Sequence, residues 1–342
     1  MFGWLKGKQV AEPPPERSTS LPGEVIWRDG TTLPIPDWER HDWPDATDGA
    51  KLHAYANGLA AAWVDALGTQ LHSGYRRDES ASFMLLSALE PRPARALLDY
   101  LERSLRRVLT TLPGIASDEG HGKTVVLVLD DEDSYYQYIA HYGSGSDEPE
   151  AFSGGMFIDW GYGHFVFAQG PFEQMEPVVV HELTHCLVRH LPIPAWLNEG
   201  LAVNTERRFS PSRPRYTAAE LAFLFGRFWN ADTIQEFWTG KSFLRADDGQ
   251  PLSYELARLL VQLLDKDYDR LARFCGQALR EDAGEAAARA VLGAGLEELA
   301  GIVLGPGEWR PQPVLWSSGT EKGQFRPEGD ARMTACRATP NP

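Results

Sequence analysis

Apolar residues recur at steps of three and four along most of the chain, which is the spacing of one face of an α-helix. The pattern begins at Asp45 and returns over residues 92–111. Pro113-Gly114 follows directly and ends this second helix. Another helix is expected after the acidic run 130–133, because acidic residues favour a helix N-terminus. Helical spacing returns in the last third of the chain, over residues 217–229, 252–276 and 280–304.

Two stretches have the character of β-strands. Residues 123–129 form a continuous β-branched and apolar run, which predicts a buried strand. Residues 153–168 predict a hairpin around the turn Gly161-Tyr162-Gly163. Gly154 and Gly155 permit a close backbone approach, so an extended peptide substrate could bind along this edge. An ordinary hairpin is the alternative interpretation.

Together these elements predict an α+β fold with a small sheet and a C-terminal helical lobe. One domain is expected over residues 45–305, with an N-terminal helical layer at 45–116 and a core at 117–305. Residues 1–44 are rich in proline and predict a tail followed by an irregular arm. Residues 306–342 gather Pro, Gly, Ser and Arg, which predicts an extended or disordered tail.

Composition narrows the possible partners. The 342 residues include 33 Lys and Arg against 48 Asp and Glu, a net charge of −15. This charge argues against binding to nucleic acid or to an anionic membrane surface. Three scattered cysteines are too few for a disulfide framework. Neither a signal peptide nor an 18-residue apolar segment is found, so a cytoplasmic location is expected, and no oligomeric state is predicted.

The motif His181-Glu182-Leu183-Thr184-His185 has the spacing of a metal site on a helix. Successive residues turn by about 100°, so His181 and His185 lie about 40° apart on one face and can bind the same ion. Glu182 projects close to that face. It is poorly placed to be a ligand, but it can reach a water molecule held by the metal and act as a general base.

A catalytic zinc ion needs a third protein ligand, and the sequence offers few. A histidine six residues after His185 would fit one known pattern, but that position is Leu191. His190 points about 140° away from His185 on the helix. Glu199 remains, because it begins a second apolar helix after a loop with two prolines that can turn the chain back. The alternative is that the two histidines are satisfied core residues.

Glu206 follows Glu199 by two helical turns and returns to within about 20° of the same helix face. It can therefore accept the second ring N–H of a ligand histidine and fix its tautomer. The alternative is a solvated helix face beside two arginines.

Residues 181–206 resemble the gluzincins, the zinc peptidases of the peptidase MA family. Residues 196–202 are similar to the W-L-N-E-G-x-A signature of the aminopeptidase branch. The resemblance implies a zincin-like catalytic domain, one zinc ion, and a peptide or protein substrate that lies along a strand edge. It implies zinc ligands His181, His185 and Glu199, the general base Glu182 and the outer partner Glu206.

The resemblance favours an endopeptidase over an aminopeptidase. Aminopeptidases of that branch bind the substrate amine with the Glu of a G-x-M-E-N strand, and residues 154–158 lack this Glu. The rival hypothesis is a non-catalytic zincin-like module that uses zinc for folding or partner binding. The intact Glu182 speaks against it, because a structural site does not need that base.

Residues 253–255 are similar to the P-Y-E-K-G segment of the same branch, whose tyrosine stabilises the oxyanion. Attack on an amide places negative charge on the carbonyl oxygen, so a hydrogen-bond donor is required there. Tyr254 is the candidate donor. The alternative is a core tyrosine at a helix start, and three other tyrosines compete for the role: Tyr162, Tyr216 and Tyr268.

Overall fold

A five-stranded sheet lies in one half of the molecule, in the order β1-β2-β3-β5-β4. The computed structural model describes residues 25–45, 47–141, 154–211 and 213–318. Strands β2, β3 and β5 run parallel, whereas β1 and β4 pair antiparallel at the two edges. The strands are β1 (Arg76–Glu79), β2 (Phe83–Ser87), β3 (Thr124–Leu129), β4 (Gly155–Ile158) and β5 (His164–Ala168).

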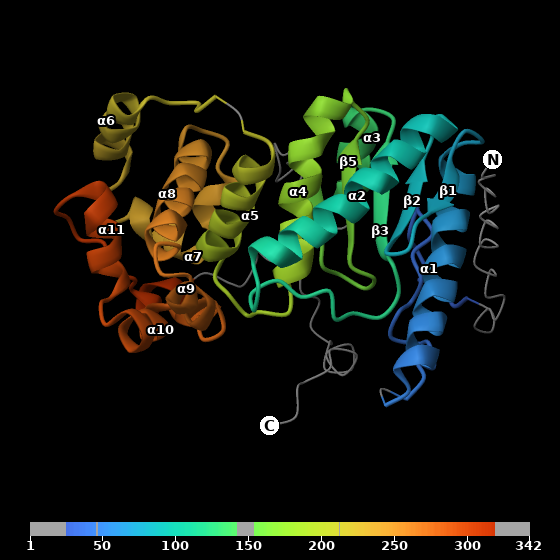
Figure 1. Cartoon of the computed structure of the whole chain (residues 1–342), viewed down its shortest axis with the longest axis horizontal. Helices are drawn as coiled ribbons and strands as arrows, with labels where there is room; N and C mark the ends of the chain where they lie inside the picture. Colours follow the sequence, from blue (N-terminus) through green and yellow to red (C-terminus); the bar gives the residue numbers. More distant parts are fainter. Residues whose placement is uncertain (1–24, 46, 142–153, 212, 319–342) are drawn as a thin grey trace, which may run out of the picture.

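Helices cover both faces of this sheet (Figure 1). Because successive residues of a strand point to opposite faces, Val125 and Leu127 of β3 pack on one side and Val126 and Val128 on the other. Helices on both faces explain why β3 is a continuous apolar run. The first face carries α1 (Gly49–Leu71) and α3 (Glu132–Ala140), and the second carries α2 (Pro91–Thr111) and α4 (Phe172–Val188).

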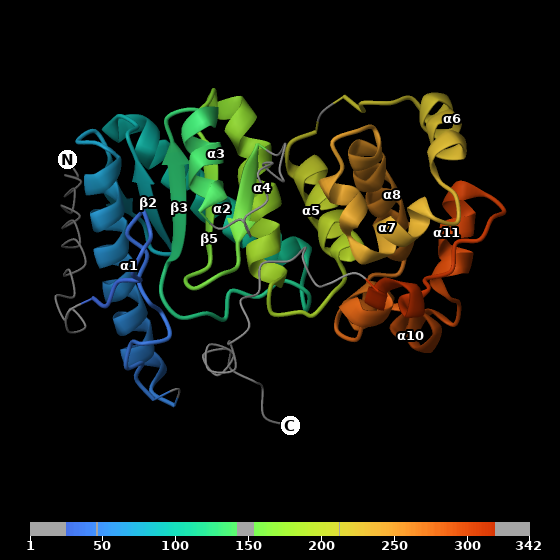
Figure 2. The ribbon, with the colours of Figure 1, turned by 180° about the vertical axis from the view of Figure 1, so that it is seen from behind.

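The other half of the molecule is helical in the residues that the structure describes (Figure 2). Its centre is aromatic. Trp196 is fully buried, packs against Trp238 and Phe274, and donates a hydrogen bond from Nε1 to the carbonyl oxygen of Ala283. The helices are α5 (Ala195–Phe209), α6 (Ala218–Phe228), α7 (Thr233–Thr239), α8 (Gly249–Leu264), α9 (Tyr268–Cys275), α10 (Glu285–Ala287) and α11 (Leu296–Leu304).

The α+β class, the long helices and the 123–129 strand are confirmed, and three elements differ from expectation. The edge pair β1–β2 and helix α7 were not predicted. The helical pair expected over 280–304 is instead the three-residue α10, a π-helical turn over Ala288–Leu292, and α11. Gly293 ends the π turn with φ of 74°, a conformation that glycine adopts without strain.

The segments outside the predicted domain pack against it where they are described. Trp38 of the N-terminal arm is buried against Trp63 of α1. Residues 306–318 are not an extended tail: Trp309 is buried, and its carbonyl oxygen accepts a hydrogen bond from Trp238 Nε1. The remaining parts of both predicted tails, 1–24 and 319–342, lie outside the described residues. None of the described helices is long and apolar enough to cross a membrane.

Candidate metal centre

Helices α4 and α5 place the motif residues at the junction between the two halves of the molecule (Figures 1 and 2). His181 and His185 lie on one face of α4, with ring centroids 4.8 Å apart. Residues 189–194 reverse the chain, and Pro194 caps the start of α5. Proline suits this boundary, because its fixed φ and missing N–H cost nothing at a helix start. As predicted, the turn brings Glu199 beside the two histidines.

Glu199 completes a group of three side chains that fits a metal ion. Its Oε2 lies 3.3 Å from His181 Nε2 and 3.5 Å from His185 Nε2. Two ligand atoms bound to zinc at about 2.0–2.1 Å with tetrahedral angles lie roughly 3.3 Å apart, which matches these separations. The contacts are badly directed for hydrogen bonds, and this buried Oε2 is left without a donor. Such an oxygen is costly unless a cation satisfies it.

Among the residues that the structure describes, this is the one group of His, Cys, Asp and Glu side chains that could hold a metal ion. The ligand atoms of the three residues all lie within 4.8 Å of one another. Two nitrogens and one carboxylate oxygen form a donor set that suits zinc and leaves a fourth position open.

Each histidine is oriented by an oxygen from α5. Glu206 Oε2 lies 3.0 Å from His181 Nδ1, which confirms the predicted contact. Asn198 Oδ1 lies 2.9 Å from His185 Nδ1, a contact that was not predicted. Because both oxygens accept, each Nδ1 carries a proton and each Nε2 faces Glu199, where its lone pair could bind a metal ion. Asn198 adjoins Glu199 in sequence, and that adjacency is the signal that could have identified it.

The charges of the group favour a bound cation. Burial acts to lower the pKa of His181, but contacts with Glu199 and Glu206 outweigh it and raise that pKa well above its usual value. The pKa of His185 is also raised, because the charge of Glu199 overcomes the effect of burial. Burial would raise the pKa of Glu199, yet its attraction to the two histidines holds that pKa well below its usual range. A metal ion would take the place of these protons.

Glu182 lies beside this group but outside it. The side chain is only 5% exposed, and burial raises its pKa, while the nearby His181 and His185 act in the opposite direction. The backbone N–H of Phe157 in β4 also interacts with the carboxylate and lowers its pKa. Glu182 is therefore a buried base between the metal group and the edge strand of the sheet.

Tyr254 is the one candidate tyrosine that the fold brings to this group. Its ring centroid lies 6.3 Å from that of His181. Burial, and then the charges of Glu199, Glu182 and Glu206, raise the pKa of its phenol well above the usual value. Its hydroxyl makes no hydrogen bond with a described residue.

The competing tyrosines are engaged elsewhere. Tyr162 donates to the carbonyl oxygen of Lys123, and Tyr268 donates to that of Pro113. Arg215 lies over the ring of Tyr216.

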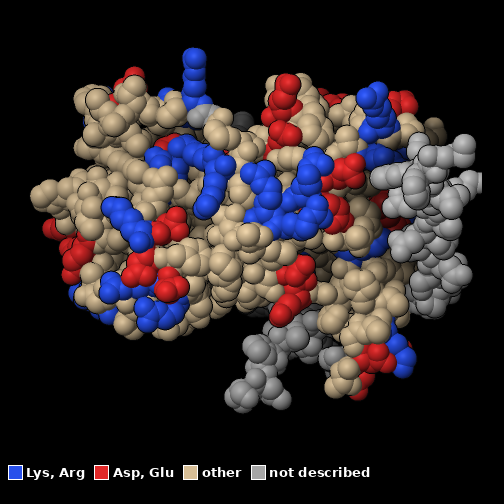
Figure 3. Space-filling view, in the orientation of Figure 1, with Lys and Arg blue, Asp and Glu red and all other residues tan. Residues whose placement is uncertain are grey.

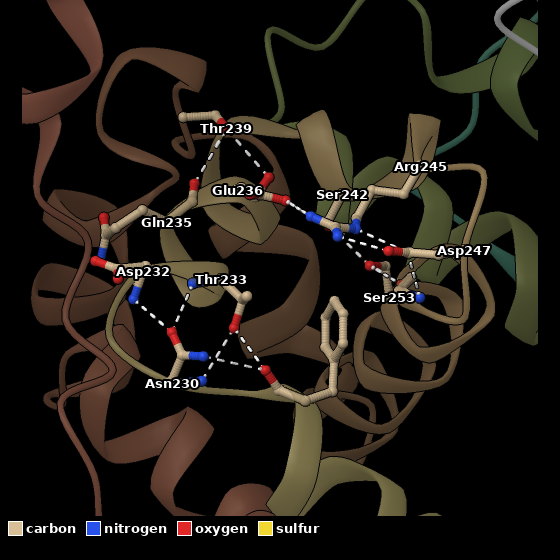
Figure 4. Close-up of polar contacts among 12 residues, drawn as sticks. Asn230, Asp232, Thr233, Gln235, Glu236, Thr239, Ser242, Arg245, Asp247 and Ser253 are labelled. Atoms are coloured by element: carbon tan, nitrogen blue, oxygen red, sulfur yellow. Dashed lines mark hydrogen bonds and ion pairs between the residues drawn. The ribbon is translucent and has the colours of Figure 1, made fainter.

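Polar contacts fix the start of α8, where Tyr254 lies (Figure 4). Ser253 donates to the hydroxyl of Ser242 at 2.7 Å. Arg245 binds Glu236 of α7 and Asp247 just before α8, each at 2.6 Å. These contacts join α7, the loop after it and the first turn of α8, so they hold the position from which Tyr254 projects.

An ion-pair network fixes α8 against α5. Glu255, only 6% exposed, binds Arg207 of α5 and Arg258 of its own helix. A nearly buried carboxylate between two guanidinium groups is a strong charge-assisted contact. Since Glu255 follows Tyr254 directly, the network also limits rotation of α8 about its axis.

The predicted glycines lie where β4 crosses α4. A Cβ atom on Gly155 would lie 2.5 Å from Val178 Cγ1, so glycine is required for β4 to approach the helix. A Cβ atom on Gly154 would also be tight, at 3.2 Å from Val178 Cγ2. Strand β4 pairs with β5 on one side and is the last strand of the sheet.

His164 lies in the interior of the protein, although it follows directly after the hairpin turn. It is 1% exposed, and Nδ1 lies 2.8 Å from the carbonyl oxygen of Tyr162 while Nε2 lies 2.8 Å from the hydroxyl of Tyr138. The carbonyl can only accept, so Nδ1 carries the proton and Tyr138 donates to Nε2. Both faces of β5 are covered, and a polar residue in such a strand must find its partners inside the protein.

No known protein family matches this chain, and no curated protein matches its sequence. What the chain does is therefore inferred from its own residues and their geometry.

Proposed function

We propose that this chain is a zinc-dependent endopeptidase of the gluzincin type, with a zincin-like catalytic domain. His181, His185 and Glu199 would hold one zinc ion. The observation that supports this most is the position of Glu182, which is buried beside the three ligands without belonging to them. A purely structural zinc site has no need of such a carboxylate and fills its fourth position with a protein ligand.

A zinc ion held by these three residues would supply Lewis-acid chemistry: it would polarise a substrate carbonyl group and make a water molecule more acidic. Glu182 accepts the proton of the attacking water and later delivers it to the leaving amine. Its raised pKa suits this work, because the carboxyl group must hold the proton between the two steps. Glu206 and Asn198 keep both histidines in the tautomer that a metal needs.

Tyr254 supplies the second requirement of amide hydrolysis, a donor for the developing oxyanion. Its hydroxyl is protonated at neutral pH, as any ordinary tyrosine is, its raised pKa extends this to higher pH, and no described residue accepts that proton. The anchored start of α8 limits how far the ring can move. A donor held in place before the reaction stabilises the transition state without reorganisation.

Strand β4 is the proposed site for the extended substrate. It is an edge strand, its residue Phe157 lies next to Glu182, and it packs along α4. A peptide that pairs with the outer edge of β4 would be held by backbone hydrogen bonds, which suit an endopeptidase because they need no free substrate terminus.

The test is the substitution Glu182→Gln, which keeps the size of the side chain and removes the base. Peptides released from a proteome digest by the zinc-loaded wild type are identified first. Glu182→Gln should retain its zinc and its fold and release almost none of those peptides. Glu173→Gln is the matched control, because Glu173 is an exposed residue of the same helix. Release of the same peptides by Glu182→Gln at the wild-type rate would overturn the proposal.

The alternative function is a non-catalytic module that uses zinc for folding or partner binding. In that case neither wild type nor Glu182→Gln releases peptides, and removal of zinc lowers the unfolding temperature of both proteins equally.

A further inference from the structure

A second polar cavity lies beyond the C-terminal end of α4, away from the metal group. Its volume is about 670 Å³, and none of the metal-ligand side chains lines it. Its walls come from the loop between α2 and β3, the turn between β4 and β5, and the last residues of α4 with Arg189, and also from α1, Trp43 before it and the β1–β2 turn. The structure thus gives two polar sites on one helix, and nothing described so far explains the second.

Arg189 is the unusual residue of this cavity. It is half-buried, and its guanidinium group makes no hydrogen bond or ion pair with a described residue. Two glycines make room for it: a Cβ on Gly163 would lie 2.3 Å from Arg189 Nη1, and one on Gly120 would lie 3.2 Å from Nη2. A guanidinium that is partly withdrawn from solvent and has no acceptor in the described protein keeps its planar set of donors available to a ligand.

The exposed arginines of α2 are ordinary surface residues and provide a comparison for Arg189. Basic side chains gather at the surface over α2 on the face seen in Figure 3. Arg92, Arg95 and Arg106 are exposed and form no ion pair with a described residue. Their hydration costs nothing, and they need no acceptor. Arg189 differs from them because it is half-buried, has no acceptor among the described residues and lines a cavity, and these features together indicate a binding site.

The rest of the lining decides the chemical class of the ligand. Lys123 and His121 are half-buried and also line the cavity, and Lys123 is already paired with Glu79. Three exposed acids, Asp118, Glu119 and Asp159, also line the cavity. These acids repel a dianion such as phosphate, but they attract a ligand that joins a carboxylate to a positive charge.

We infer that this cavity binds a small zwitterion, an α-amino acid or a peptide C-terminus, with its carboxylate on Arg189 and its positive group toward the acidic residues. A guanidinium matches a carboxylate through two parallel hydrogen bonds, and this geometry selects a carboxylate over an amide. The site does not depend on the proposed peptidase reaction, because it shares no ligand residue with the metal group.

The test is calorimetric titration with four probes: lysine, glycyl-lysine, glycyl-lysinamide and inorganic phosphate. The titrations use the zinc-loaded Glu182→Gln protein, in which glycyl-lysine stays intact whether or not the wild type is a peptidase. Either lysine or glycyl-lysine should bind. Binding of lysine would indicate an amino-acid site, and binding of glycyl-lysine would indicate a site for a peptide C-terminus. Glycyl-lysinamide should bind at least about tenfold more weakly than glycyl-lysine, as expected for loss of a charged hydrogen-bonded pair.

Adding Arg189→Gln should weaken the carboxylate probes by at least about tenfold, whereas the control Arg95→Gln should leave them unchanged. If Arg189→Gln does not fold, Arg189→Lys replaces it, because lysine keeps the positive charge but lacks the planar pair of N–H donors. Arg189→Lys should weaken binding of lysine and glycyl-lysine more than binding of glycyl-lysinamide. Equal binding by the acid and the amide would overturn the inference. So would unchanged binding in the Arg189 variants, or phosphate binding more tightly than both carboxylates.

Discussion

His164 and the pair His181–His185 are all enclosed by protein, yet their surroundings act on them in opposite ways. Burial lowers the pKa of His164 to about 4, and the hydrogen bond to the carbonyl oxygen of Tyr162 opposes this only in part. At the metal group, Glu199 and Glu206 overcome the same effect of burial and raise the pKa of His181. The comparison shows that neighbouring charge, and not burial alone, decides whether a histidine site in this protein favours a cation.

The partners of the ring nitrogens follow the same division. His164 is held by a carbonyl oxygen and a tyrosine hydroxyl, which satisfy a neutral ring. His181 and His185 are held by a carboxylate and an amide oxygen on Nδ1, and their Nε2 atoms face another carboxylate. One environment stabilises the neutral imidazole, and the other is prepared for a metal ion.

The strongest way to break the comparison is to remove the carboxylate that the two ligand histidines share. Glu199→Ala should abolish stoichiometric zinc binding, because two histidines alone give too few ligands. Metal analysis of the purified variant measures this directly. Glu173→Ala, an exposed glutamate of α4, should retain full zinc. A full equivalent of zinc in Glu199→Ala would mean that another residue is the third ligand.

A tyrosine accompanies the histidines in each region, and the two should differ in what they do. Tyr254→Phe should lower kcat by roughly 10²–10³ with little change in KM, as for loss of one oxyanion donor. Tyr138→Phe leaves His164 Nε2 without its hydroxyl donor and should cost about 1–3 kcal/mol of stability with kcat unchanged. Steady-state kinetics and chemical unfolding separate the two effects. A folded Tyr254→Phe with wild-type kcat would assign Tyr254 to packing.

The metal group was predictable because its spacing is local. His181 and His185 share a helix face whatever surrounds the helix, and Glu206 returns to the face of Glu199 by the same rule. The proline-containing loop indicated that the chain turns back. Asn198 was not predicted, because its contact with His185 depends on the rotation of α5 against α4, which tertiary packing decides.

The sheet was only half predictable. Strand β3 is apolar on both faces and can be read from composition, but the edge strand β1 is Arg76–Glu79, a run of charged residues. It is a strand because β2 provides hydrogen-bond partners, and no local preference reveals this. The burial of His164 cannot be read from the sequence for a similar reason, since Trp63 of α1 and Tyr138 of α3 contact it from distant parts of the chain.

The lowered pKa of His164 should make the stability of the protein depend on pH. Its pKa is about 4 in the folded protein against an ordinary 6.5, so below pH 6.5 the unfolded chain binds a proton that the folded chain does not. Stability is therefore lost as pH falls from 6.5 to 4, by roughly 3 kcal/mol for a shift of this size. His164→Asn should be less stable at pH 7.5 and show a flatter profile over this range. Urea unfolding at several pH values measures both, and an unchanged slope would show that His164 does not titrate as described.

The smallest expected effect separates the charge of Glu206 from its hydrogen bond. Glu206→Gln keeps an oxygen that can accept a hydrogen bond from His181 Nδ1. It removes the negative charge beside His181 that favours a bound cation. Zinc affinity should fall about 10-fold to 100-fold, the usual size for an outer partner of a metal ligand, while kcat of the fully loaded protein changes little. Asn198→Ala removes a neutral acceptor from His185 and isolates the orienting effect without a change of charge. Competition with a zinc chelator measures both affinities. A Glu206→Gln protein that binds zinc as tightly as the wild type would show that orientation of the ring, and not neighbouring charge, makes this site receptive to a metal ion.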